Sequence, residues 1–151
     1  MQEVAESLSR GGFAVCDNFI PLELVRQARR EMAALVPHFE ASEIWVGKDA
    51  AAGAQIQVPD VRGDRVLWMC GAHQTPSRGT WRCSTLLESS RRRGGWMQHV
   101  VERSDAMLAV YPGKDTRFQT HIDNTACDGR VLTCLCYLNT EWEEEFGGAL
   151  R

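Results

Sequence analysis

The stretch MLAVYPGKDTRFQTHIDNTACDGRVLTCLCYLN, residues 107–139, contains three runs of β-branched and aromatic residues. These runs are residues 107–113, 117–123 and 130–139, and the sequences PGKD and NTACDG separate them. Valine, threonine and tyrosine favour pleated strands, whereas Gly, Pro, Asn and Asp favour turns. The stretch therefore predicts consecutive strands of a meander or a barrel.

The residues before this stretch predict helices, two further strands and two loops. Apolar residues at helical spacing predict a long helix from Pro21 to Val36, and Gly11 and Gly12 end a short helix at residues 4–9. Strand composition predicts strands at residues 13–16 and, after a turn at Gly63, up to Met69. A helix with a weak point at its glycines is predicted at residues 85–101. The pattern weakens over residues 37–59, where the AAAGA run (50–54) predicts a mobile loop, and residues 73–80 predict another loop.

Length and composition are those of a single globular domain. The chain has 151 residues, of which 44% are hydrophobic and 25% charged, and its formal net charge is −3. This balance provides no basic field for nucleic acid, and the three arginines at 91–93 are typical of a solvated helix face. No stretch has the ~18 apolar residues of a membrane span, and the first residues lack the pattern of a signal peptide. We therefore expect a cytoplasmic or nuclear protein with no nucleic-acid or membrane partner.

Six cysteines stand at positions 16, 70, 83, 127, 134 and 136, and none forms a C-x-x-C pair. Buried thiols in a reducing compartment are the favoured interpretation, and a disulfide framework is the alternative.

His121 and Asp123 are the candidate metal ligands. Residues i and i+2 of a strand project from the same face with Cα atoms about 6.6 Å apart, so both side chains can reach one ion if the strand bends slightly. An imidazole and a carboxylate are donors of the two-histidine, one-carboxylate site that leaves open positions on Fe(II). The spacing alone also fits a histidine and an aspartate at the end of a strand. The remaining histidines, at 38, 73 and 99, have no ligand-like neighbours.

The surrounding motifs carry a more specific indication. Residues 107–139, followed by Trp142 and GGALR (147–151), closely resemble the iron and 2-oxoglutarate dependent prolyl hydroxylases of the oxygen-sensing kind, which modify hypoxia-inducible factor. VRGDRVLW (61–68) resembles a second stretch of that family, and FAVCDNFIP (13–21) with the helix after it resembles its N-terminal part. The resemblance implies an α+β fold with a double-stranded β-helix core of the jelly-roll type. In this interpretation residues 1–104 form an N-terminal supporting region and residues 105–151 the first half of the core.

The resemblance also implies roles for particular residues. It makes His121 and Asp123 two of three iron ligands. It places four residues at the 2-oxoglutarate pocket, namely Met107, Tyr111, Leu135 and Tyr137. It places Arg62, Asp64 and Arg130 beside the peptide substrate, with the first two at the start of a loop over the active site. Without the resemblance, the two tyrosines are interpreted as core aromatic residues whose hydroxyls lie at the rim of the core. Arg62 and Asp64 are then interpreted as a local ion pair on a solvated loop, which contributes ~0 to 1 kcal/mol to stability if exposed.

One family ligand has no counterpart here. In the family the second histidine ligand, and the basic residue that pairs with the far carboxylate of 2-oxoglutarate, lie several strands beyond the GGALR segment. No residue after Asp123 is a histidine. We therefore expect a chain with an incomplete core, open sheet edges and only weak affinity for Fe(II).

The implied function is a dioxygenase that uses Fe(II), 2-oxoglutarate and O2, with ascorbate as reductant, to hydroxylate prolyl residues of a protein substrate in the hypoxia response. We expect this chain to be inactive alone. One alternative is a truncated, non-catalytic binding module. Another is an oxygenase of the same fold with a different target, such as a ribosomal protein, because substrate choice depends on loops such as residues 70–84.

Overall fold

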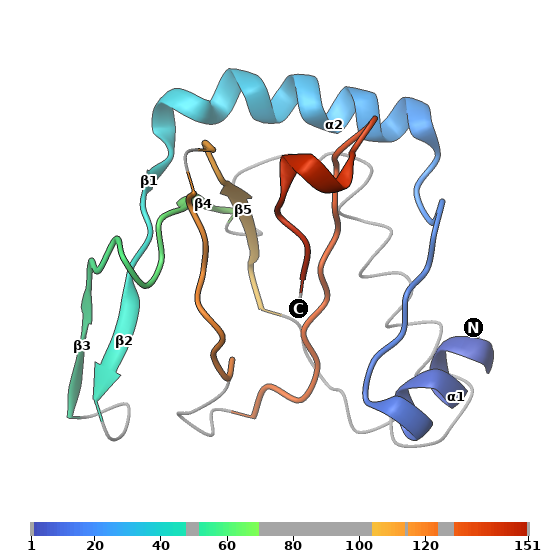
Figure 1. Cartoon of the computed structure of the whole chain (residues 1–151), viewed down its shortest axis with the longest axis horizontal. Coiled ribbons are helices and arrows are strands. Elements are labelled where there is room, and N and C mark those ends of the chain that lie inside the picture. Colours follow the sequence, from blue (N-terminus) through green and yellow to red (C-terminus); the bar gives the residue numbers. More distant parts are fainter. Residues whose placement is uncertain (1, 48–51, 70–103, 114, 124–128, 151) are drawn as a thin grey trace. The chain divides into compact units, whose positions relative to one another are not determined.

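Figure 1 shows the chain as a computed structural model, which describes residues 2–47, 52–69, 104–113, 115–123 and 129–150. The chain divides into two compact units, one of residues 1–31 and 75–104 and the other of residues 32–74 and 105–151. All the predicted site residues lie in the second unit. The predicted division into residues 1–104 and 105–151 stays a prediction.

Helix α1, Gln2–Gly11, confirms the predicted short helix at the N-terminus. Glu3 in its first turn and Arg10 in its last turn complement the helix dipole. The helix ends at Gly12, whose φ of +76° lies in the left-handed region and whose amide donates a hydrogen bond to the carbonyl of Leu8. Glycine adopts this conformation without a steric penalty, which explains the position of the helix end.

Helix α2, Leu22–Leu35, confirms the predicted long helix. Pro21 stands directly before it, and its carbonyl accepts hydrogen bonds from the amides of Leu24 and Val25. The strand predicted at residues 13–16 is wrong, because this segment is irregular in the structure. Strand composition is not sufficient where no neighbouring strand supplies hydrogen bonds, and none of the described strands pairs with these residues.

Three antiparallel strands form the sheet that carries part of the candidate site. Its order is β1 (Glu40–Ala41), β4 (Arg65–Met69) and β5 (Ala106–Val110) (Figure 1). The strands β4 and β5 confirm two of the predicted strands. Their register places Arg65 opposite Val110 and Trp68 opposite Met107. The guanidinium of Arg65 also donates a hydrogen bond to the carbonyl of Phe39, the most buried large side chain among the described residues.

A second, two-stranded sheet lies within residues 37–59, where the sequence predicts no strand, and it includes the last two residues of the loop predicted at residues 50–54. The strands β2 (Ile44–Gly47) and β3 (Gly53–Ile56) pair antiparallel, and the 3-10 helix η1 (Val36–His38) precedes β1. A Cβ atom at Gly53 would collide with the indole of Trp45, so glycine permits the close approach of the two strands. Four-residue strands with little apolar alternation give too weak a pattern to predict from sequence.

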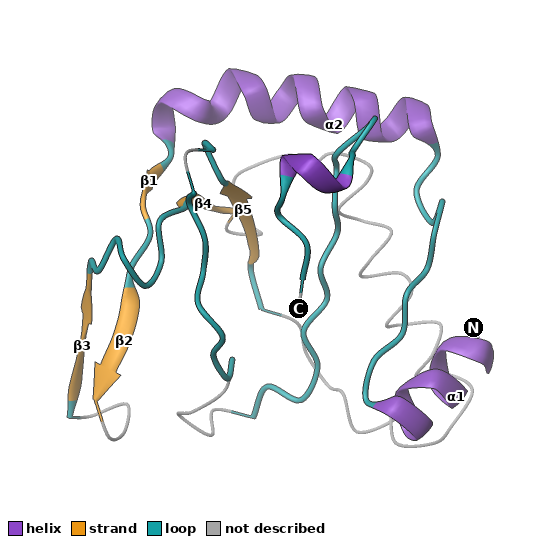
Figure 2. Cartoon of the chain, viewed as in Figure 1, coloured by secondary structure: helices purple, strands orange, loops and turns teal. Residues whose placement is uncertain are grey.

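The strands predicted at residues 117–123 and 130–139 are also wrong. Figure 2 shows the described parts of both segments as loops, and the regular element among the described residues that follow is the short 3-10 helix η3 (Glu144–Phe146). Residues 117–119 make a single bridge, between Phe118 and Arg62. Residues 130–139 have strand composition, but they pair with none of the described strands. A strand is stable only when its backbone groups have a partner strand.

Burial is concentrated in few side chains of the described residues. In the second unit the buried residues are Phe39, Ser42 and Asp64, of which the last two are polar. The prediction of buried cysteines is wrong for Cys16, Cys134 and Cys136, which are exposed because they lie on irregular segments. The loop predicted at residues 73–80 and the helix predicted at 85–101 lie outside the described residues. None of the described helices is long and apolar enough to cross a membrane.

Candidate metal centre

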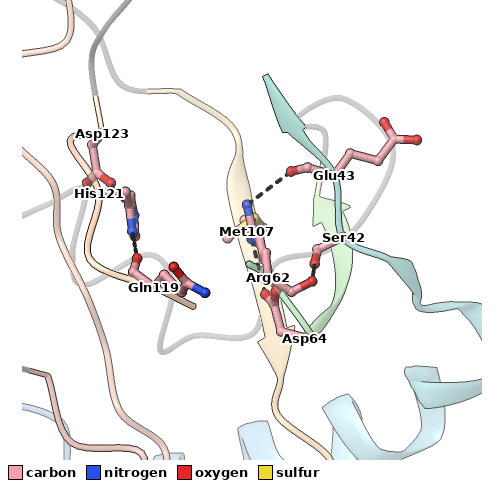
Figure 3. Close-up of polar contacts among 8 residues, drawn as sticks. All are labelled: Ser42, Glu43, Arg62, Asp64, Met107, Gln119, His121 and Asp123. Atoms are coloured by element: carbon pink, nitrogen blue, oxygen red, sulfur yellow. Dashed lines mark hydrogen bonds and ion pairs between the residues drawn. The ribbon is translucent and has the colours of Figure 1, made fainter. Parts of the chain in front are cut away.

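The side chains of His121 and Asp123 lie against each other. Nε2 of His121 is 3.0 Å from Oδ1 of Asp123 (Figure 3). The two side chains meet on an irregular segment that bends at Thr120, rather than on a continuous strand. The geometry therefore brings together the two residues that the sequence singled out, although by a different backbone path.

The second ring nitrogen of His121 has its own partner. Nδ1 lies 2.7 Å from the carbonyl oxygen of Gln119, and because a carbonyl can only accept, Nδ1 carries the proton of this hydrogen bond. With Nδ1 engaged in this way, the ring nitrogen left to bind a metal ion is Nε2, which faces Asp123. Hydrogen bonds of this kind behind a ligand fix the tautomer and the orientation of a metal-binding histidine.

Thr133 orients the carboxylate of Asp123. Its hydroxyl donates a hydrogen bond of 2.6 Å to Oδ2, the oxygen that does not face His121. Because Oδ2 is engaged in this way, Oδ1 is the oxygen available beside the imidazole. Thr133 belongs to the segment 130–139, so this bond links that segment to the candidate ligands.

The pair fits two neighbouring positions of an octahedral metal ion. Donors on adjacent corners of an octahedron with bonds of about 2.1 Å lie about 3.0 Å apart. The separation of Nε2 and Oδ1 has this value, which is also that of a direct hydrogen bond between an imidazole and a carboxylate. One imidazole nitrogen and one carboxylate oxygen are also donors that Fe(II) accepts in oxygenases. Among the described residues no group of three His, Cys, Asp or Glu side chains converges, so a third protein ligand is not found in this part of the chain.

A second charged pair lies on the segment before β4. Arg62 binds Asp64 through two hydrogen bonds, from Nε to Oδ1 at 2.8 Å and from Nη2 to Oδ2 at 3.1 Å (Figure 3). The side chain of Asp64 is 0% exposed and that of Arg62 is 14% exposed. Burial raises the pKa of Asp64, but hydrogen bonds from Arg62 and Ser42 and the charge of Arg62 outweigh it, so the pKa lies below its ordinary value of 3.8.

This buried pair touches the sheet beside Tyr111. Nη2 of Arg62 lies 3.5 Å from the sulfur of Met107 on β5. Burial raises the pKa of Tyr111 above 10.0, the charges of Asp64 and Tyr137 raise it further, and Arg62 lowers it. The phenol of Tyr111 therefore stays protonated and can donate a hydrogen bond to a carboxylate. The structure thus brings Arg62 and Asp64 close to Met107 on β5 and to Tyr111, which directly follows β5, with Tyr137 near enough to affect the titration of Tyr111.

The other predicted site residues lie on the irregular segment 130–139. Arg130, Leu135 and Tyr137 are all exposed there. The predicted place of Leu135 in a co-substrate pocket stays a prediction.

Sequence reasoning missed three residues that support the two charged pairs. Ser42 supports the Arg62–Asp64 segment, because its amide binds the carbonyl of Asp64. Thr133 binds Asp123, and Phe118 stacks on the imidazole of His121 with ring centroids 3.6 Å apart. Only Thr133 had a signal in the sequence, since it shares the predicted strand face of Leu135 and Tyr137.

Residues 106–151, which include both candidate ligands, match the 2OG-Fe(II) oxygenase superfamily. The class of protein that this segment and its His–Asp pair resemble is therefore that of the iron and 2-oxoglutarate dependent oxygenases. No solved structure matches the chain.

More particular relatives are prolyl hydroxylases. The chain is 31% identical to the rat prolyl hydroxylase EGLN3 over 156 residues, which cover all of this chain and 63% of that protein. It is 29% identical to the hypoxia-inducible factor prolyl hydroxylase of Caenorhabditis elegans, over 99% of this chain and 21% of that protein. It is 28% identical to human Egl nine homolog 1, over 100% of this chain and 35% of that protein. The expected resemblance to prolyl hydroxylases of the hypoxia-inducible factor type is confirmed, and the chain spans less than two thirds of the length of these relatives.

Proposed function

We propose that this protein is an Fe(II) and 2-oxoglutarate dependent dioxygenase that hydroxylates prolyl residues of a protein substrate, with a core of the double-stranded β-helix type. The observation that carries the proposal is the His121–Asp123 pair, whose donor atoms are 3.0 Å apart within the segment that matches the 2OG-Fe(II) oxygenase superfamily. The named activities of the relatives supply the substrate class.

In this proposal Nε2 of His121 and Oδ1 of Asp123 hold the iron. Iron with 2-oxoglutarate and O2 would supply the oxidising chemistry that converts a prolyl C–H group to C–OH, with succinate and CO2 as co-products. The carbonyl of Gln119 and the hydroxyl of Thr133 hold the two ligands in orientation from behind. Hydrogen bonds of this kind restrict the rotation of the two donors and preorganise a metal site.

Tyr111 is the proposed contact for a carboxylate of 2-oxoglutarate. Its raised pKa keeps the hydroxyl protonated, and a phenol donates to a carboxylate only in that form. Met107 lies on the same face of β5 and supplies an apolar wall, and we propose that Tyr137 and Leu135 complete the pocket. Arg130 is the exposed member of the three residues proposed for the peptide side. Ascorbate as reductant and a cytoplasmic or nuclear location remain part of the proposal.

The test is a hydroxylation assay with the native gene product purified from its source. The protein is incubated with Fe(II), 2-oxoglutarate, ascorbate and proline-containing peptides from hypoxia-inducible factor and from ribosomal proteins. Succinate formation is measured together with the peptide mass. We expect a gain of one oxygen atom on a proline, with one succinate formed for each hydroxylated peptide.

Two substitutions control the assay. His121→Ala removes a proposed ligand and should abolish both products. His38→Ala removes an exposed histidine of η1 and should leave both unchanged. If succinate forms but none of the proline-containing peptides gains an oxygen atom, the assignment of a prolyl substrate is refuted. Equal activity of the His121→Ala variant and the unsubstituted protein would refute the iron site.

A further inference from the structure

Phe118 contacts both charged pairs. Its ring stacks on the imidazole of His121, with centroids 3.6 Å apart and an angle of 17° between the planes. The guanidinium carbon of Arg62 lies 4.6 Å from the centroid of the same ring. The three side chains form a continuous series, the Arg62–Phe118–His121 stack, from the buried pair to a candidate ligand.

The backbone explains why Arg62 and Phe118 meet. They are opposite each other in an antiparallel bridge. The hydrogen bonds on either side run from the amide of Gly63 to the carbonyl of Arg117 at 3.0 Å and from the amide of Gln119 to the carbonyl of Val61 at 2.9 Å. Arg62 and Phe118 are therefore a non-hydrogen-bonded pair, the arrangement in which opposite side chains come closest.

Arg62 is a fixed support for the phenyl ring. Its two hydrogen bonds to Asp64 and its contact with Met107 hold the guanidinium in one orientation. A third, longer hydrogen bond joins Nη1 to the carbonyl of Glu43 at 3.5 Å (Figure 3). A guanidinium over an aromatic face is attractive, and burial of the pair strengthens the attraction.

His121 lacks such support from a regular strand. The chain bends at Thr120, so a strand ladder does not fix the direction of the imidazole. The ring plane is instead fixed by the stacked Phe118, and rotation within that plane is fixed by the bond from Nδ1 to Gln119. Together these two contacts aim Nε2 at Asp123.

We propose that Phe118, held by Arg62, is a positioning residue for His121 and sets the orientation in which the imidazole binds metal. This inference rests on the proposed function for the identity of the metal site, but the stack is formed by side chains of this chain alone. Arg62 and Asp64 thereby act on the candidate ligand through the stack.

The first experiment tests the stack without metal. Histidine ring protons of the metal-free native product are observed by NMR after selective labelling, and His121 is assigned from the His121→Ala variant. A ring stacked at this distance shifts the His121 signals upfield. We expect Phe118→Leu to remove this shift and Phe118→Tyr to retain it. Phe146→Leu, which changes an exposed phenylalanine of η3, should have no effect.

The second experiment tests positioning. Co(II) is titrated into the same variants, and the absorption spectrum of the bound ion is recorded together with a thermal unfolding curve. We expect Phe118→Leu to weaken Co(II) binding by about 10 to 100-fold at temperatures where the variant is folded, the usual effect of losing a contact behind a ligand. Phe118→Tyr should bind as tightly as the unsubstituted protein. Phe146→Leu should do the same.

The outcomes separate the two proposals. If Phe118→Leu removes the upfield shift but leaves Co(II) affinity and spectrum unchanged, the stack exists and positioning is refuted. If Phe118→Leu leaves the His121 shift unchanged, the stack is refuted. If the unsubstituted protein shows the shift but binds no Co(II), the proposed metal site fails and positioning of a ligand fails with it, whereas the stack stands.

Discussion

Two charged pairs in this protein have the same spacing in sequence and opposite surroundings. Arg62 and Asp64 are two positions apart, as are His121 and Asp123, and their closest nitrogen–oxygen distances are 2.8 and 3.0 Å. The side chains of the first pair are 14% and 0% exposed, whereas those of the second are 38% and 47% exposed.

This difference separates a structural pair from a candidate ligand pair. A carboxylate taken out of water must be compensated by direct partners, and Asp64 has Arg62 and Ser42. His121 and Asp123 remain accessible, and each is oriented by one neutral hydrogen-bonding group, Gln119 or Thr133. The accessible nitrogen and oxygen atoms of His121 and Asp123 can bind a metal ion. The polar atoms of the buried pair already bind each other.

The largest expected contrast is in stability. Replacing Asp64 by Ala leaves a mostly buried guanidinium without its partner, and we expect the free energy of unfolding to fall by about 3 to 5 kcal/mol. Replacing Asp123 by Ala breaks an exposed pair, and we expect a change of ~0 to 1 kcal/mol. Chemical denaturation of the metal-free variants measures both values. Equal losses would contradict the distinction between the pairs.

A smaller effect is expected from Thr133 on metal affinity. Thr133→Val removes the hydroxyl that orients Asp123, and we expect Co(II) affinity to fall about tenfold, the lower end of the range for residues behind ligands. Thr133→Ser keeps a hydroxyl and is the matched control, with affinity close to that of the unsubstituted protein. Titration calorimetry measures both. An unchanged affinity in the valine variant would show that Asp123 does not need this bond.

The buried pair should also contribute to stability only above acidic pH. Because the pKa of Asp64 is lowered in the folded state, the unfolded chain binds more protons as the pH falls below 3.8. The contribution of Asp64 is thus fully present above this ordinary pKa and is lost as the pH falls through the lower, folded value. The difference in unfolding free energy between the unsubstituted protein and Asp64→Asn should shrink in that acidic range. A difference independent of pH would contradict the lowered pKa.

The smallest expected effect is on the titration of Tyr111. Burial is the main cause of its raised pKa, and the charge of Asp64 adds to it. We expect Asp64→Asn to lower the pKa of Tyr111 while leaving it above 10.0. NMR of labelled tyrosine in alkaline titration measures the change, and Asp17→Asn, which changes an exposed aspartate of the other unit, is the control. If Asp64→Asn leaves the pKa of Tyr111 unchanged, the charge of Asp64 does not act on Tyr111, which would contradict the account.

The sequence predicted the elements whose signals are local. Helical spacing and the end signals at Gly12 and Pro21 are sufficient for α1 and α2, and short apolar runs beside turn residues are sufficient for β4 and β5. Residues 130–139 have the same composition, but a strand depends on a partner, which composition does not encode. The hairpin of β2 and β3 was missed for the converse reason, because pairing forms it despite a weak local pattern.

The site shows the same division between local and non-local information. The H-x-D spacing identified His121 and Asp123, although their convergence depends on the bend at Thr120 and not on a strand face. Phe118 could not be predicted, because residues three apart lie on opposite faces of a strand and stack only after the bend. The contacts of Arg62 with Met107 and Phe118 likewise could not be predicted from the sequence, because these residues are far from Arg62 along the chain.

Metal titration tests the central claim most directly. Co(II) is added to the native gene product in the presence of 2-oxoglutarate, for the unsubstituted protein and for the His121→Ala, Asp123→Ala and His38→Ala variants. The predicted result is tight binding by the unsubstituted protein and His38→Ala, with a loss of more than about 100-fold in the other two, beyond the effect of a residue behind a ligand. Equal affinity of all four proteins would contradict the assignment of His121 and Asp123 as metal ligands.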